Sequence, residues 1–113
     1  MKNYLFFFRG GLDFSEAPAQ QVQEVIGKWR TWVEELTQKG IYNGGERLTR
    51  GDAAVLKGSS KQIVAGAYSA NGEQLGGYIS IKADSLYEAI EVAKGCPIFE
   101  FKGNVEVREA VSA

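Results

Sequence analysis

The stretch from Val64 to Tyr78 combines ligand-binding side chains with a permissive backbone. Its sequence, VAGAYSANGEQLGGY, contains Tyr68, whose ring can stack on a planar ligand, and Glu73, whose carboxylate can accept hydrogen bonds or a proton. Glycine-rich loops beside a sheet are common binding places, because glycine permits tight backbone turns. The stretch therefore predicts the rim of a ligand pocket. The alternative is a loop whose glycines only turn the chain.

Three more side chains complete the candidate pocket: Tyr78, Trp32 and Arg9. Trp29 and Trp32 lie three residues apart in an apolar helical stripe, a pattern more typical of a core than of a cavity lining. Arg9 ends an apolar strand and can bind a carboxylate through two hydrogen bonds. A surface ion pair of Arg9 with Glu106 or Glu109 is the favoured interpretation.

The chain contains no histidine, the side chain most often used for proton transfer near neutral pH. Ser-His-Asp and Cys-His catalytic groups are therefore excluded. Cys96 is the only cysteine, so a zinc site of ordinary composition is excluded too. Cys96 follows the expected end of a helix, where the helix dipole disfavours a thiolate, and we interpret it as an inert small hydrophobic residue. We expect no metal and no cofactor.

The composition is that of a single soluble domain spanning residues 1–113. The net charge is −1 and the basic residues are scattered, which argues against nucleic-acid binding. The longest N-terminal apolar run covers residues 4–8, too short for a signal peptide or a membrane span. One cysteine excludes an intrachain disulfide and fits a reducing compartment, so we expect a cytoplasmic protein without membrane contact.

The first expected element is a strand over residues 4–8, an aromatic run followed by Arg9 and two glycines. Its residues divide into Leu5 and Phe7 on one face and Tyr4, Phe6 and Phe8 on the other. Apolar residues on both faces predict a strand that is covered on both sides.

An amphipathic helix is expected over residues 18–39, because apolar residues recur every three or four positions. Gly27 costs this helix about 1 kcal/mol against alanine and so indicates a close approach of another element. The next segment predicts a short strand near Leu48. A hairpin follows, with strands at residues 54–57 and 62–65.

The second half predicts a strand over residues 78–83 and then a helix, which Ser85 and Glu88 begin as a capping box. The expected buried stripe of this helix is Leu86, Ala89, Ile90 and Ala93. The chain closes with the apolar segment 98–101, a turn or bulge at residues 102–104, and a half-buried strand over residues 105–108.

This order of elements predicts an α+β, ferredoxin-like β-α-β-β-α-β fold, with an antiparallel sheet and both helices on one face. The other face of such a sheet is apolar and bare. We expect a second copy to cover it, which predicts a homodimer through the sheet face that carries Phe6 and Phe8.

Several short motifs, in order, resemble the YCII-related proteins and in particular their DGPF branch. They are Trp29-x-x-Trp32-x-x-x-Leu36-x-x-x-Gly40, Gly45 with Leu48, Leu75-Gly76-Gly77-Tyr78, Ser85 with Glu88, Ala89 and Pro97, and Val105-Glu106-Val107-Arg108. No single motif is specific, but together they cover nearly the whole chain. The resemblance implies a dimeric α+β barrel.

The resemblance also places Ala65-Gly66-Ala67-Tyr68 where the family has Asp-Gly-Pro-Phe. Some family members act through a His–Asp pair, and neither partner is present here. This departure favours a catalytically degenerate protein that binds a small molecule or serves as an accessory protein. The alternatives are an enzyme acting on a small organic substrate by carboxylate chemistry, with Glu73 as the base, and a protein–protein interaction module.

Overall fold

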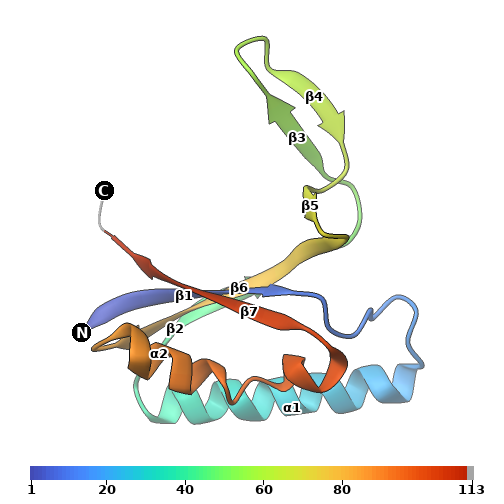
Figure 1. The fold of residues 1–113 in the computed structure, drawn as a ribbon. Coiled ribbons are helices and arrows are strands. Elements are labelled where there is room, and N and C mark those ends of the chain that lie inside the picture. The colour runs from blue at the N-terminus through green and yellow to red at the C-terminus, as the bar shows by residue number, and fades with distance from the viewer. Residues whose placement is uncertain (112–113) are drawn as a thin grey trace.

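The computed structural model describes residues 1–111, in which both helices lie on one face of an antiparallel sheet (Figure 1). The strand order is β2-β6-β1-β7, and the short β5 pairs with β6. The sheet strands are β1 (Lys2–Arg9), β2 (Tyr42–Arg47), β5 (Ser69–Ala70), β6 (Glu73–Ala83) and β7 (Asn104–Ala110), and the helices are α1 (Ala19–Gln38) and α2 (Leu86–Ala93). The predicted ferredoxin-like fold is confirmed.

The side chains of the central strand β1 show which face of the sheet the helices cover. Phe6, opposite Ile79 of β6 and Val107 of β7, is fully buried, and its ring stacks on Trp32 of α1 with centroids 6.4 Å apart. Phe8 is buried on the same face. The prediction that the Phe6 and Phe8 side is bare and available to a second copy is therefore wrong. A strand that is apolar on both faces does not reveal by its periodicity which face the helices take.

The opposite, outer face of the sheet carries Leu5 and Phe7, which are half-buried without any helix above them. Tyr78 of β6 pairs with Phe7 and lies on this outer face too. The face without helices is therefore the one formed by the other set of residues. It is not an apolar face as predicted, because Leu5 lies opposite Ser80 and Arg108, and Phe7 lies opposite Glu106.

Helix α1 follows Pro18 and ends before Gly40, whose φ of 74° provides the left-handed stop. A Cβ atom built on Gly27 would meet no atom within 4 Å, so the predicted close approach at this glycine is wrong. Within residues 1–111, no helix has the length and hydropathy needed to cross a membrane.

Strand β2 lies slightly before the segment where a strand was expected, and Leu48 extends it by donating its N–H to the Gly76 carbonyl at 2.9 Å. The strand runs very close to β6, since a Cβ atom on Gly77 would lie 2.8 Å from the Glu46 carbonyl oxygen. Glycine at this position lets the two backbones meet.

The predicted hairpin is confirmed at its expected boundaries. Within residues 1–111, strands β3 (Ala54–Lys57) and β4 (Gln62–Ala65) pair only with each other, with Leu56 opposite Ile63. Figure 1 shows the hairpin projecting away from the sheet, on the side opposite the helices.

Helix α2 begins as predicted, because the Ser85 hydroxyl accepts a hydrogen bond from the Glu88 amide at 3.2 Å. The Glu88 carboxylate in turn accepts from the Asp84 amide at 2.9 Å. Only part of the expected apolar stripe is buried: Ala89 and Ala93 are, whereas Leu86 and Ile90 are exposed.

Residues 98–101, for which the sequence predicts no particular element, form the 3₁₀ helix η1 (Pro97–Phe101). Proline is suited to the first turn of a helix, where its missing N–H is not needed. Lys102 ends η1 in the left-handed conformation, with φ 62°. The following β7 confirms the last predicted strand.

Two glycine substitutions test this packing. We expect Gly27→Ala to raise the free energy of unfolding by roughly 0.5–1 kcal/mol, because alanine favours the helix and space is free around it. We expect Gly77→Ala to lower it by about 2 kcal/mol, because its Cβ atom would force β2 and β6 apart. Urea unfolding followed by circular dichroism measures both. A neutral Gly77→Ala would contradict the close approach of the two strands.

Candidate functional site

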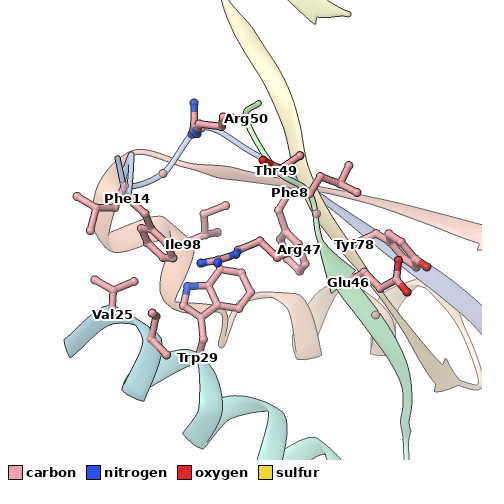
Figure 2. Close-up of a pocket in the computed structure, with 18 of the residues that line it drawn as sticks. Phe8, Phe14, Val25, Trp29, Glu46, Arg47, Thr49, Arg50, Tyr78 and Ile98 are labelled. Atoms are coloured by element: carbon pink, nitrogen blue, oxygen red, sulfur yellow. The ribbon is translucent and has the colours of Figure 1, made fainter. Parts of the chain in front are cut away.

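A cleft of about 880 Å³ opens at the end of the molecule where β2 ends and β6 begins (Figure 2). Its walls come from the β1–α1 loop, the first half of α1, the end of β2 with the loop after it, and η1. These segments are far apart in the sequence, so the cleft exists only in the folded chain. Its volume lies within the range typical of small-molecule sites.

The floor and walls of the cleft are mainly aromatic and aliphatic. The ring of Trp29, on α1, packs edge-to-face on Phe8 with centroids 4.9 Å apart. Phe14, from the β1–α1 loop, and Ile98, from η1, complete the apolar lining around them. Such edge-to-face packing holds the rings in defined orientations, which presents flat apolar surfaces to a planar ligand.

Arg47 places a positive charge inside the cleft. Figure 2 shows its side chain extending from β2 toward Trp29 and Phe14, and its Cζ atom lies 5.1 Å from the centroid of the Phe14 ring. None of the ion pairs found within residues 1–111 involves Arg47. Its guanidinium donors are therefore available to an anion that enters between the rings.

A second arginine, Arg50, connects the two loops at the rim. Its Nε lies 3.8 Å from an Oδ1 oxygen of Asp13. The pKa of Asp13 lies below its usual value because the hydroxyl of Ser15, at 2.6 Å, and the amide of Ser15, at 3.0 Å, donate hydrogen bonds to the carboxylate. Arg50 lowers this pKa further by its charge. Asp13 is thus an ionised, engaged carboxylate and is not suited to act as a proton acceptor.

Asp13 does not line the cleft, and Glu46, the carboxylate that does, points away from its interior. Figure 2 shows the side chains of Glu46 and Tyr78 directed away from Trp29 and Arg47, toward the outer face of the sheet. Together with the absence of histidine, this leaves a cleft equipped to bind an anion and poorly equipped to move a proton.

The five residues predicted to form a pocket are not brought together by the fold. Tyr78 contributes to the cleft lining, but its ring faces outward. Trp32 is buried in the core beneath the cleft, and Tyr68 is exposed in the segment between β4 and β5. Glu73 accepts a hydrogen bond from the Asn104 amide at 3.1 Å and does not line the cleft.

The fifth residue, Arg9, forms an ion pair with Glu106 at 2.8 Å, as the favoured surface interpretation predicted. The two tryptophans differ in role. Trp32 belongs to the core as predicted, whereas Trp29 is only partly buried and lines the cleft.

Sequence reasoning missed Arg47, Arg50 and Phe14. Arg47 stands in the segment YNGGER, which has no apolar alternation and gives no strand pattern from which a facing direction can be read. Phe14 is the one aromatic residue of the loop at residues 10–18, in which Leu12 is the other large apolar residue. That isolated aromatic is the one signal that could have pointed to this loop.

With this geometry established, comparisons with known proteins give the family. The model of the YCII-related domain matches residues 12–112. The chain belongs to the YCII-related family. A search of curated protein sequences finds no match to this YCII-related chain.

Among solved structures, this YCII-related chain is similar to the 5-chloro-2-hydroxyhydroquinone dehydrochlorinase TftG from Burkholderia phenoliruptrix AC1100, solved in complex with 2,5-dihydroxybenzoquinone. The similarity covers 98% of this chain and 95% of that chain, with a TM-score of 0.54 and 15% sequence identity. At this identity the likeness shows a shared fold.

Cys96 lies outside the cleft, in the turn that links α2 to η1, and its side chain is buried. Burial raises the pKa of its thiol from 9.0 to about 12. The side chain is therefore protonated at physiological pH, which agrees with its interpretation as an inert small hydrophobic residue. Within residues 1–111, no three histidine, cysteine, aspartate or glutamate side chains are grouped so that they could hold a metal ion.

The raised pKa of Cys96 predicts a pH-dependent loss of stability. Above pH 9 the unfolded chain releases the thiol proton while the folded chain keeps it until about pH 12, so the free energy of unfolding falls with pH. We expect the difference in this free energy between the wild type and Cys96→Ala to shrink by roughly 1 kcal/mol from pH 8 to pH 10. Urea unfolding of both proteins measures it. A constant difference would show that the thiol is not desolvated.

Proposed function

We propose that this YCII-related protein binds a small planar organic anion in the cleft, without histidine-based catalysis. The observation that carries the proposal is the position of the Arg47 guanidinium, which lies among aromatic side chains and makes no ion pair within residues 1–111. A carboxylate or phenolate group would accept its hydrogen bonds, and the ring of the ligand would pack on Trp29 and Phe14.

The charges of the cleft also disfavour cationic ligands and purely apolar ligands. A cationic ligand would meet Arg47 and Arg50 and find Asp13 already engaged. A purely apolar ligand would leave the Arg47 charge partly desolvated and unpaired, which is unfavourable. The ligand in the TftG complex, 2,5-dihydroxybenzoquinone, is a planar ring with acidic hydroxyl groups. It belongs to the class proposed here and serves as a probe.

Catalysis on a small organic substrate is the alternative function, as in the dehydrochlorinase of similar fold. Glu73 was its expected base, but this carboxylate lies off the cleft and is hydrogen-bonded to Asn104. Binding without turnover is therefore the better supported function.

A charge-removing variant tests the proposal. We expect the wild type to bind 2,5-dihydroxybenzoquinone or benzoate in isothermal titration calorimetry at neutral pH. We expect Arg47→Gln to weaken binding by 10-fold to 100-fold, since hydrogen bonds to a charged group contribute about 1.5–3 kcal/mol.

The matched control is Arg30→Gln, which removes the same charge from an exposed position on α1 outside the cleft. It should bind as the wild type does. Equal losses of affinity in both variants would show that the effect comes from the net charge alone. Failure of the wild type to bind either probe at millimolar concentration would reject a site for small aromatic anions.

Glu73→Gln distinguishes binding from catalysis. We expect this variant to keep the affinity of the wild type for the probe, because Glu73 does not line the cleft. We also expect neither protein to release chloride from 5-chloro-2-hydroxyhydroquinone, the compound for which the dehydrochlorinase of similar fold is named. Chloride release by the wild type that is lost in Glu73→Gln would support the enzyme alternative.

A further inference from the structure

A second arginine, Arg50, lines the rim of the cleft three residues after Arg47. The Leu48 amide donates a hydrogen bond to β6 at 2.9 Å, which fixes the chain between the two arginines. The Thr49 hydroxyl accepts a hydrogen bond from the Gly51 amide at 3.0 Å and so closes the turn that carries Arg50. Residues three apart lie at most about 10 Å from each other along the chain, so both arginines belong to one wall of the cleft.

The Arg50 guanidinium is only weakly engaged by the protein. Within residues 1–111, its ion-pair partner is Asp13, whose Oδ1 oxygen lies 3.8 Å from the Arg50 Nε atom. This separation is too long for a hydrogen bond. The same Oδ1 oxygen already accepts two hydrogen bonds from Ser15, at 2.6 Å and 3.0 Å. The Arg50 side chain is 49% exposed, so its donors are accessible to a ligand that extends to the rim.

The two guanidinium groups give the cleft more positive charge than its own residues neutralise. Arg47 makes no ion pair within residues 1–111, and Arg50 makes only the long one with Asp13. Glu46, the carboxylate of the lining, is directed toward the outer face of the sheet. A ligand with one anionic group pairs with one arginine and leaves the other without a ligand partner. A ligand with two anionic groups can pair with both.

The two arginines also lie at different depths in the cleft. Figure 2 shows Arg47 extending toward Trp29 and Phe14, whereas Arg50 lies farther from Trp29, on the loop after β2. A flat ligand that packs on these rings and pairs with Arg47 therefore has another edge that can reach the rim.

We propose that Arg50 is a second anion-binding residue, which selects planar ligands that carry two acidic groups. Arg47 holds one group between the aromatic rings, and Arg50 holds the other at the rim. This inference rests on the function proposed above, because it requires that the cleft binds a planar anion. The ligand class is a ring with two carboxylates, or with a carboxylate and a phenolate, at separate positions.

Two ligands of the same shape and different charge test this selection. They are isophthalate, with two carboxylates, and 3-carbamoylbenzoate, in which an amide replaces one carboxylate. In isothermal titration calorimetry at neutral pH, we expect the wild type to bind isophthalate roughly 3-fold to 10-fold more tightly, since Arg50 is half-exposed and such charge pairs are weaker than buried ones. We expect Arg50→Gln to bind both ligands equally, with the affinity of the wild type for 3-carbamoylbenzoate.

The matched control is again Arg30→Gln on α1, which should keep the preference of the wild type for isophthalate. A preference that Arg50→Gln retains, or that Arg30→Gln loses as well, would overturn the role of Arg50. Equal affinities of the wild type for the two ligands would overturn it too, while leaving the anion site at Arg47 in place. If the wild type bound neither ligand at millimolar concentration, the proposed function would be rejected together with this inference.

A measurement on the wild type alone tests the contact even if Arg50→Gln fails to fold. The Nε–H group of each arginine gives a signal in a ¹H–¹⁵N spectrum. We expect isophthalate to cause saturable shifts of both the Arg47 and the Arg50 signals, and 3-carbamoylbenzoate to shift chiefly the Arg47 signal. An Arg50 signal that isophthalate leaves unmoved, while the Arg47 signal shifts, would contradict the second contact.

Discussion

The structure depends on the packing of one aromatic ring, Phe8, between the sheet and α1. Phe8 is buried on the inner face of the central strand and meets both Trp29 and Trp32 edge-to-face. On the side of Trp32, the Phe8 ring is part of the hydrophobic core. On the side of Trp29, the same ring lines the cleft. The position of α1 on the sheet therefore also sets the shape of the cleft, so fold stability and site geometry share the same contact.

Local patterns in the sequence predicted most of the fold, because they act over a few residues. The three- and four-residue period defined α1, the loop 58–61 defined the hairpin, and Ser85 defined the start of α2. Predictions failed where contacts between residues far apart in the sequence determine the structure. The helices cover Phe6 and Phe8 rather than Leu5 and Phe7.

The site was less predictable than the fold, because its residues come from segments without periodicity. Arg47 owes its direction to the pairing of a glycine-rich strand with β6, and Phe14 to a loop closed by Asp13 and Ser15. The glycine-rich stretch 64–78 contains good ligand-binding side chains, but only its last residues reach the cleft. Residue types indicate possible chemistry, whereas the fold decides which of them meet.

The two tryptophans provide the most direct test that the cleft is the binding site, because Trp29 lines it and Trp32 lies in the core. In a ¹H–¹⁵N spectrum each indole gives its own signal. On titration with 2,5-dihydroxybenzoquinone, we expect a saturable shift of the Trp29 signal that exceeds the shift of the Trp32 signal. An unmoved Trp29 signal, with shifts confined to the backbone of residues 65–73, would contradict binding in the cleft. It would place the binding site in the glycine-rich stretch instead.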